Sequence, residues 1–142
     1  MLHVGITEQG ISAGRAIRRA AKKAAKAASK AEGKKGRLFV SILFTDDDNI
    51  RRLNKQYREK DAVTDVLSFP SGDDGFIGDI ALSLPRAAQQ AEEFGHTEER
   101  EAAFLVAHSM LHLFGYDHEN KYDEKRMRER QREILEKAGY KL

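Results

Sequence analysis

The pattern of apolar and polar positions begins with an amphipathic helix near the N-terminus. Its apolar positions, at helical spacing within residues 12–31, are Ala13, Ile17, Ala20, Ala24, Ala27, Ala28 and Ala31. Arginine and lysine residues follow the opposite side of the same segment. Because the apolar face is mostly alanine, we expect this helix to lie close against a sheet. Gly33 and Gly36 end it.

The next segments predict a strand followed by a helix. Residues 38–44 are apolar on both alternating faces, which is typical of a central strand that is covered on two sides. Thr45 then begins a helix, with Asp48 three residues later as its capping-box partner. Ile50, Leu53 and Tyr57 form the predicted buried stripe of that helix.

The second half of the chain continues the alternation. Residues 66–69 and 77–82 are strand candidates, and residues 70–75 form a turn between them. Helices are predicted over residues 84–94, 97–114 and 123–138. The second of these is apolar nearly all round after Glu101 and is therefore the expected core helix. The third has Met127, Gln131, Ile134, Leu135 and Ala138 on one face.

These elements predict an α/β (mixed α+β) fold, with a small mixed sheet of about four strands packed against about five helices. The length of 142 residues is typical of one domain, spanning residues 1–142. The absence of cysteine excludes disulfides, thiolate zinc sites, iron–sulfur clusters and a cysteine nucleophile. The longest apolar run has six residues, and the N-terminus lacks a signal-peptide pattern. We therefore expect a cytoplasmic protein with no membrane partner.

Charge changes this picture because it is distributed unevenly. The net charge is +2, yet the segment from Arg15 to Arg37 holds ten Lys and Arg residues and a single acid, Glu32. That segment carries +9, and the rest of the chain carries −7. Such a segment indicates either an anionic partner or simply a solvated helix face. Membrane binding fits less well, because the apolar face lacks the Trp, Phe or Leu that would insert.

Three of the five histidines lie within eleven residues, at the end of the expected core helix. His108 and His112, four residues apart, share a helix face, and Gly115 allows the chain to turn so that His118 can return as a third ligand. Three imidazoles with a fourth position left open are typical of a catalytic zinc site. The alternative is that these are satisfied core histidines, as we expect of the isolated His3 and His96. Burying two imidazoles without a shared partner costs a few kcal/mol, which favours the metal.

The spacing H-x-x-x-H-x-x-G-x-x-H matches that of the metzincin proteases. Those enzymes carry a glutamate directly after the first histidine as the general base, and Ser109 stands there in this chain. A hydroxyl cannot accept a proton from water near neutral pH as a carboxylate can. A bound zinc ion would still lower the pKa of a coordinated water towards neutrality. Ordinary proteolysis is therefore disfavoured while metal-dependent hydrolysis of another bond is not.

The segment from His108 to His118, HSMLHLFGYDH, resembles the signature of the YbeY family of bacterial metal-dependent endoribonucleases. The segment from Leu53 to Pro70, LNKQYREKDAVTDVLSFP, resembles the second motif of this family, and Gly78-Asp79-Ile80 resembles its third. The similarity runs from about residue 40 to residue 135. Two positions depart from the family pattern: Val63 stands where many members have proline, and Ser109 where many have glycine.

The resemblance implies a single-strand-specific, metal-dependent endoribonuclease that matures the 3′ end of small-subunit ribosomal RNA and acts in ribosome quality control. It implies one Zn²⁺ per chain, held by His108, His112 and His118. Arg58 matches the arginine that faces the metal across the cleft, so Arg58 and His112 are the expected catalytic residues. The implied partners are single-stranded and ribosomal RNA, the small ribosomal subunit with its proteins, and an Era-type assembly GTPase.

Other polar residues near these motifs have two possible roles. Asp65 and Asp79 can orient the ligand imidazoles, or they can be a turn cap and a strand-end charge. Asp117 and Glu119 can move protons or be polar loop residues. Two other functions also stay open: a peptidase-like metal-dependent hydrolase, and a non-catalytic ribosome-assembly factor with structural zinc.

Overall fold

The computed structural model describes residues 1–117 and 120–140 and confirms the mixed α/β fold. The strands are β1 (Leu2–Gln9), β2 (Leu38–Thr45), β3 (Val66–Pro70) and β4 (Phe76–Ser83). The helices are α1 (Arg15–Ala31), α2 (Asp47–Arg58), α3 (Leu84–Phe94), α4 (Glu98–Leu113) and α5 (Lys121–Ala138). The described strands form a sheet in the order β1-β2-β4-β3. Strands β1, β2 and β4 are parallel, and β3 is antiparallel to β4.

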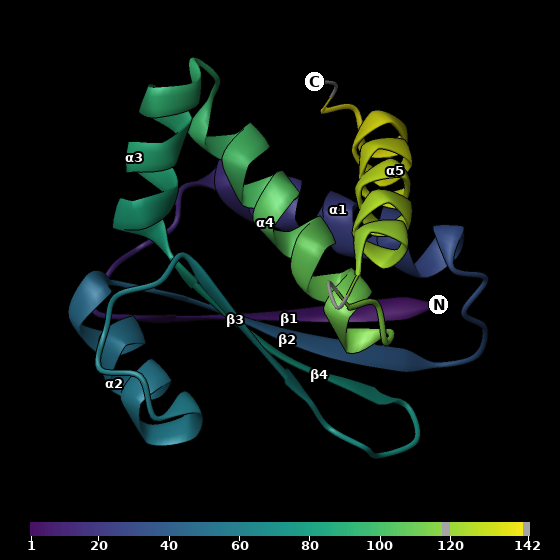
Figure 1. Cartoon of the computed structure of the whole chain (residues 1–142), viewed down its shortest axis with the longest axis horizontal. Coiled ribbons are helices and arrows are strands. Elements are labelled where there is room, and N and C mark those ends of the chain that lie inside the picture. The colour runs from purple at the N-terminus through teal and green to yellow at the C-terminus, as the bar shows by residue number, and fades with distance from the viewer. Residues whose placement is uncertain (118–119, 141–142) are drawn as a thin grey trace.

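The helices cover the two faces of the sheet unequally. Figure 1 shows α2 on one side of the sheet and the other four helices on the opposite side. Val40, Ile42 and Phe44 of β2 lie on the face that the four helices cover, and they are fully buried. On the other face, Leu43 packs in the cluster of Ile50 from α2, whereas Phe39 is 38% exposed. The two-sided burial predicted for β2 therefore holds only at the end that α2 covers.

Helix α1 packs through small residues against both α4 and the sheet. Its buried positions include Ala20, Ala21, Ala24, Ala25 and Ala28, which we call the alanine face. The principal neighbour of this helix is α4, and it also packs against α5 and β1. The alanine face shares one core cluster with Val40, Ile42 and Phe44, so the expectation that α1 can lie close against the sheet is confirmed. Small residues of α4 in the same core cluster, Ala103 and Ala107, let the two helices approach closely.

The start and the buried stripe of α2 also differ from the prediction. Asp46, rather than Thr45, caps the helix, because its carboxylate accepts a hydrogen bond of 2.9 Å from the Asn49 N–H. Thr45 still belongs to β2, and its hydroxyl donates to the carbonyl of Gln9. Tyr57 is 59% exposed rather than buried. Asn54 is buried instead, because its amide donates to the Ala62 carbonyl at 3.0 Å and so holds the loop after α2.

The remaining elements lie close to their predicted bounds. Helix α3 spans residues 84–94 as predicted, and the five positions predicted for the buried face of α5 are its buried residues. Helix α4 is the core helix, since nine of its residues are buried. Strand β1 was not predicted, although Leu2, Val4 and Ile6 alternate with more polar residues in the pattern of a strand.

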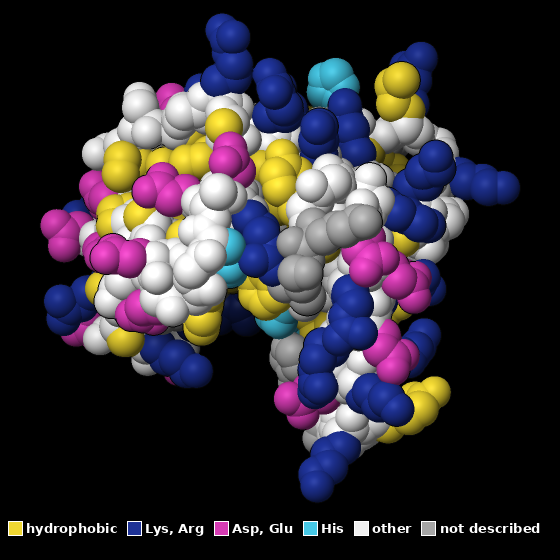
Figure 2. Space-filling view, turned by 90° about the horizontal axis from the view of Figure 1, so that it is seen from above, with side chains coloured by type: hydrophobic (Ala, Val, Ile, Leu, Met, Phe, Trp, Pro, Cys, Tyr) yellow, Lys and Arg dark blue, Asp and Glu magenta, His cyan; other side chains and the backbone are white. Residues whose placement is uncertain are grey.

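The exposed side of α1 is strongly basic. Arg15, Arg19, Lys22, Lys26 and Lys30, which we call the basic face, are all exposed. Figure 2 shows Lys and Arg side chains gathered along the upper edge of the view, with few acidic side chains among them. Within the described residues, the only cation of α1 in an ion pair is Arg18, which lies 3.3 Å from Glu8. No helix among residues 1–117 and 120–140 is long and apolar enough to cross a membrane.

Candidate metal centre and substrate cleft

The last turns of α4 bring two imidazoles together. The Nε2 atoms of His108 and His112 are 3.1 Å apart, and the two ring centroids are 4.7 Å apart. Two nitrogens bound to one tetrahedral zinc ion at 2.0–2.1 Å lie about 3.3 Å from each other. The separation of the two Nε2 atoms therefore fits two ligands of a single ion.

The loop after α4 fixes the orientation of His112. The Tyr116 carbonyl oxygen lies 3.0 Å from Nδ1 of His112, so this nitrogen carries the hydrogen and donates it. The opposite nitrogen, Nε2, is then left with a lone pair for a metal. Gly115, at a φ of 100°, supplies the left-handed turn that returns Tyr116 to the helix end, where its N–H donates to the Leu111 carbonyl. His108 is supported differently, by stacking on the Phe104 ring.

The third predicted ligand, His118, lies outside the described residues, as does Glu119. Among residues 1–117 and 120–140, no group of three His, Cys, Asp or Glu side chains is close enough to hold a metal ion. The described part of the chain thus contributes two converging nitrogen donors. That donor set suits zinc and other borderline transition metals rather than magnesium or calcium.

The histidines open into a cleft of about 910 Å³ that also contains Arg58. Helix α2 ends directly after Arg58, where Glu59 adopts a left-handed conformation with a φ of 59°. The Arg58 guanidinium donates to the Ser68 carbonyl of β3 and lies over the Phe69 ring, 5.3 Å from its centroid. The structure therefore places the arginine and the two histidines from separate sequence motifs in one cleft.

Sequence reasoning missed Lys60, a second cation that lines this cleft. Its only signal in the sequence is its place two residues after Arg58. The loop that carries it is pinned by an ion pair between Arg51 and Asp61, with Nε and Oδ1 2.6 Å apart. Hydrogen bonding to Arg51 holds the pKa of Asp61 below its ordinary value.

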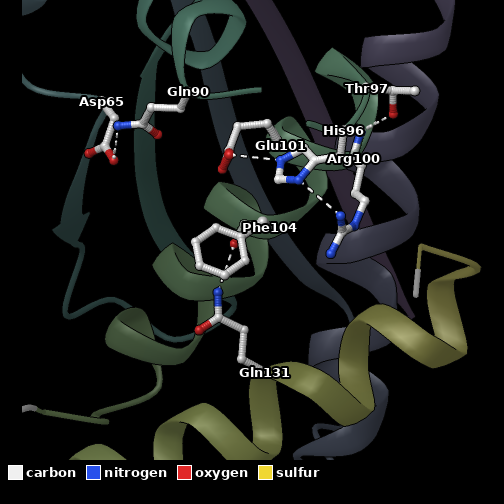
Figure 3. Close-up of polar contacts among 8 residues, drawn as sticks. All are labelled: Asp65, Gln90, His96, Thr97, Arg100, Glu101, Phe104 and Gln131. Carbon is white, nitrogen blue, oxygen red and sulfur yellow. Dashed lines mark hydrogen bonds and ion pairs between the residues drawn. The ribbon is translucent and has the colours of Figure 1, made fainter. Parts of the chain in front are cut away.

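Asp65 lines the cleft but acts as a cap at the start of β3. Its Oδ1 accepts from the N–H of Val66 at 2.7 Å. Its Oδ2 accepts from the Gln90 amide at 3.3 Å, as Figure 3 shows. Of the two roles expected for Asp65, these hydrogen bonds correspond to the turn cap. Its link to Gln90 joins the cleft wall to α3.

Asp79 cannot orient the ligand imidazoles, because it lies on the opposite face of the sheet. The preceding residue, Gly78, faces α4, where an added Cβ would lie 3.0 Å from the Leu113 side chain and overlap the Phe69 carbonyl oxygen. Side chains alternate along β4, so Asp79 points away and lines a separate hollow beside Tyr57. The Gly-Asp-Ile motif thus serves close packing at Gly78.

Ser109 is fully buried, and its hydroxyl has no hydrogen-bond partner within the described residues. It is not among the described residues that line the cleft. Asp117, in contrast, lines the cleft and is exposed.

A second polar cluster lies at the opposite end of α4 (Figure 3). Nε2 of His96 is 3.2 Å from the carboxylate of Glu101, which is only 2% exposed, and Nδ1 of His96 is 2.9 Å from the Arg100 guanidinium. This cluster holds the turn between α3 and α4. His96 therefore has a structural partner, in line with the expectation that it lies outside the site.

Comparison with known proteins gives a consistent result. The family model described as "Endoribonuclease YbeY" matches residues 6–139. A protein with this name from Roseiflexus sp. is 51% identical over 116 residues, which cover 73% of this chain and 72% of that protein. Another from Macrococcus caseolyticus is 48% identical over 118 residues, covering 76% and 77% of the two chains. The solution structure of a Thermotoga maritima protein matches with a TM-score of 0.69 and 31% identity, covering 96% of this chain and 89% of that one.

Proposed function

The chain belongs to the YbeY endoribonuclease family, and from this membership we propose that it is a metal-dependent endoribonuclease that cuts single-stranded RNA in the cleft beside α4. The observation that carries this proposal is the meeting of His108, His112 and Arg58 in one cleft. An RNA phosphodiester needs a cation for its developing charge as well as an activated water. The cleft offers groups for both tasks.

We propose one Zn²⁺ per chain, held by His108, His112 and His118. The convergence of the first two Nε2 atoms supports the site, and the Tyr116 carbonyl keeps His112 in the tautomer that a metal requires. A metal ion bound there supplies a Lewis acid for a phosphoryl oxygen and activates water for attack. His112 is in this sense both a ligand and part of the catalytic machinery.

Arg58 is proposed to bind the scissile phosphate. Its guanidinium is held between the Ser68 carbonyl and the Phe69 ring, so it loses little further freedom when a phosphate arrives. A planar guanidinium can donate two parallel hydrogen bonds to a phosphate, which an amine cannot do. Lys60, in the same cleft, adds a second positive charge for the RNA backbone.

The natural substrate that we propose is the 3′ end of small-subunit ribosomal RNA, cut in the cytoplasm by one domain that spans the whole chain. The proposed partners are the small ribosomal subunit with its proteins and an Era-type assembly GTPase. The relatives' name supports RNA as the substrate class. The basic face of α1 supports contact with a large polyanion such as ribosomal RNA.

Ser109 disfavours the peptidase-like alternative, because a hydroxyl stands where the metzincin proteases carry the glutamate that acts as general base. Asp117 is the described carboxylate nearest in the chain to the histidine pair, and it is exposed at the cleft edge. The non-catalytic assembly factor remains the competing function, and cleavage decides between the two.

The test is cleavage of a single-stranded ribosomal RNA 3′ fragment by the purified, zinc-loaded full chain. His112→Ala should lose both metal and cleavage. Arg58→Ala should keep its metal and lower kcat/KM by about 10²- to 10³-fold, as for loss of one preorganised charge-stabilising group. Arg52→Ala is the matched control, because Arg52 is an exposed arginine of α2 that bonds to Asn49 and does not line the cleft.

Removal of metal by a chelator should abolish cleavage, and added zinc should restore it. Full cleavage by the Arg58→Ala variant would contradict the role of Arg58. No cleavage by the wild-type protein at full metal occupancy would overturn the enzyme proposal in favour of the assembly factor.

A further inference from the structure

The loop that follows α4 is held by a carboxylate that is far away in the sequence. Glu32, directly after α1, accepts a hydrogen bond of 2.9 Å from the Tyr116 hydroxyl. The same carboxylate pairs with Arg130 of α5, with Oε2 and Nε 2.9 Å apart. The Glu32 side chain is only 13% exposed. Glu32 therefore joins α1, α5 and the loop after α4 at one partly buried point.

Tyr116 connects this point to His112. Its hydroxyl binds Glu32 at one end of the residue, and its backbone carbonyl accepts from Nδ1 of His112 at the other. The Arg126 guanidinium lies over the Tyr116 ring, 5.4 Å from the centroid, and is a second contact of this side chain with α5. The hydrogen bond to Glu32 restricts the Tyr116 side chain to one conformation and so ties this residue, whose carbonyl accepts from His112, to α1 and α5.

The surroundings of Glu32 make it unusual in its segment. It is the single acid among the eleven charged residues from Arg15 to Arg37, and the other ten are basic. A partly buried carboxylate is stable only when it is paired and hydrogen-bonded, and Glu32 has both kinds of partner. An exposed residue of a basic helix would need neither.

We propose that Glu32 is a positioning residue for the metal centre: through Tyr116 it holds the carbonyl that orients His112. This inference rests on the metal site proposed above. Groups that orient a metal-binding histidine typically change metal affinity by 10- to 100-fold when they are removed. The Glu32–Tyr116 hydrogen bond acts one step further out, so we expect a loss of about tenfold.

The experiment measures zinc affinity of the full chain by competition with a chromogenic chelator, with no RNA present. Glu32→Ala and Tyr116→Phe should each weaken zinc binding about tenfold. Glu32→Gln should restore most of the affinity, because its side-chain carbonyl still accepts from the Tyr116 hydroxyl. The double variant Glu32→Ala/Tyr116→Phe should be no weaker than either single variant, since both remove the same bond.

Glu133→Ala is the matched control. Glu133 is the other carboxylate on Arg130, 3.0 Å from its Nη1, and it is more exposed. This variant should lower stability slightly and leave zinc affinity unchanged. The visible absorption of Co²⁺ bound in place of zinc provides a second readout, and its band should change in Glu32→Ala and Tyr116→Phe but not in Glu133→Ala.

Wild-type zinc affinity and an unchanged Co²⁺ spectrum in Glu32→Ala and Tyr116→Phe would overturn the proposal and leave Glu32 as a brace for the fold. Equal weakening by Glu133→Ala would also overturn it, because the effect would then come from Arg130 and α5. Failure of the wild-type chain to bind zinc would instead overturn the metal site itself, and the role of Glu32 with it.

Discussion

Ser109 is a polar residue in the middle of the core helix, next in sequence to one of the two converging histidines. Its hydroxyl is fully buried without a hydrogen-bond partner in the described residues. An unsatisfied buried hydroxyl costs free energy that an apolar side chain of similar size avoids. Alanine also has the higher helix propensity.

Ser109→Ala should therefore raise the free energy of unfolding by about 1 kcal/mol or more, measured by urea denaturation. RNA cleavage should stay at the wild-type rate, because the side chain does not line the cleft. Ser109→Glu should instead destabilise the protein strongly by burying a charge. A loss of stability in Ser109→Ala would show that the hydroxyl is bonded in solution.

Gly78 gives a second prediction at this scale. A Cβ at this position would overlap the Phe69 carbonyl oxygen, which is backbone and cannot easily move. Gly78→Ala should lower the free energy of unfolding by about 1–3 kcal/mol in urea denaturation. Gly14→Ala is the control, since nothing lies within 4 Å of that position; a similar loss in both variants would refute the steric explanation.

Residue roles could be predicted from the sequence only where the chemistry is local. The shared face of His108 and His112 follows from helical spacing, and the structure places their Nε2 atoms together. The role of Asp79 could not be decided, because it depends on which face of the sheet the side chain occupies. That face is set by the pairing of β4 with its neighbours, which no local pattern contains.

At the scale of the elements, the strong stop and start signals were reliable. Pro85 and Gly95 bound α3 as predicted, and the buried face of α5 follows its apolar spacing. The sequence-based predictions were wrong where tertiary contacts decide which residues are buried. Tyr57 has the right spacing for burial in α2, but it is exposed. Asn54 is buried instead, and its amide donates to the carbonyl of Ala62 in the following loop. The packing of the alanine face on α4 could likewise not be predicted from the sequence.

The close approach of α1 and α4 can be tested on the alanine face. Ala24 is fully buried, so Ala24→Leu should force the helices apart and lower the free energy of unfolding by about 1–3 kcal/mol. Ala16→Leu is the matched control, because Ala16 is exposed on the same helix. Urea denaturation of both variants measures the difference. An equal, small effect in the two variants would show that the interface has room for larger side chains.

At the scale of the whole molecule, charge is segregated by element. The basic face of α1 is exposed without acidic partners in the described residues, whereas α5 intersperses its cations with acids in pairs such as Arg128 with Glu124. A surface of unpaired cations binds nucleic acid by releasing counterions, and its affinity falls steeply with salt. The charge of the basic face therefore suits a polyanion such as RNA.

Reversal of three charges, Lys22→Glu, Lys23→Glu and Lys26→Glu, should weaken RNA binding and make its dependence on salt shallower, measured by fluorescence anisotropy across a salt series. Reversal of three exposed charges of α5, at Lys125, Arg132 and Lys137, is the control and should have a smaller effect. RNA affinity that is insensitive to salt, or unchanged by the α1 reversal, would show that this surface is merely solvated.

The pairing of α1 with α4 also has a consequence for how the protein is made. The two helices lie far apart in the sequence, since α1 ends at residue 31 and α4 begins at residue 98. During synthesis, the alanine face of α1 emerges from the ribosome long before α4, so this apolar surface stays exposed to water until α4 has been made. The core is completed only when the last third of the polypeptide has been translated, because α4 and α5 supply part of the same core cluster.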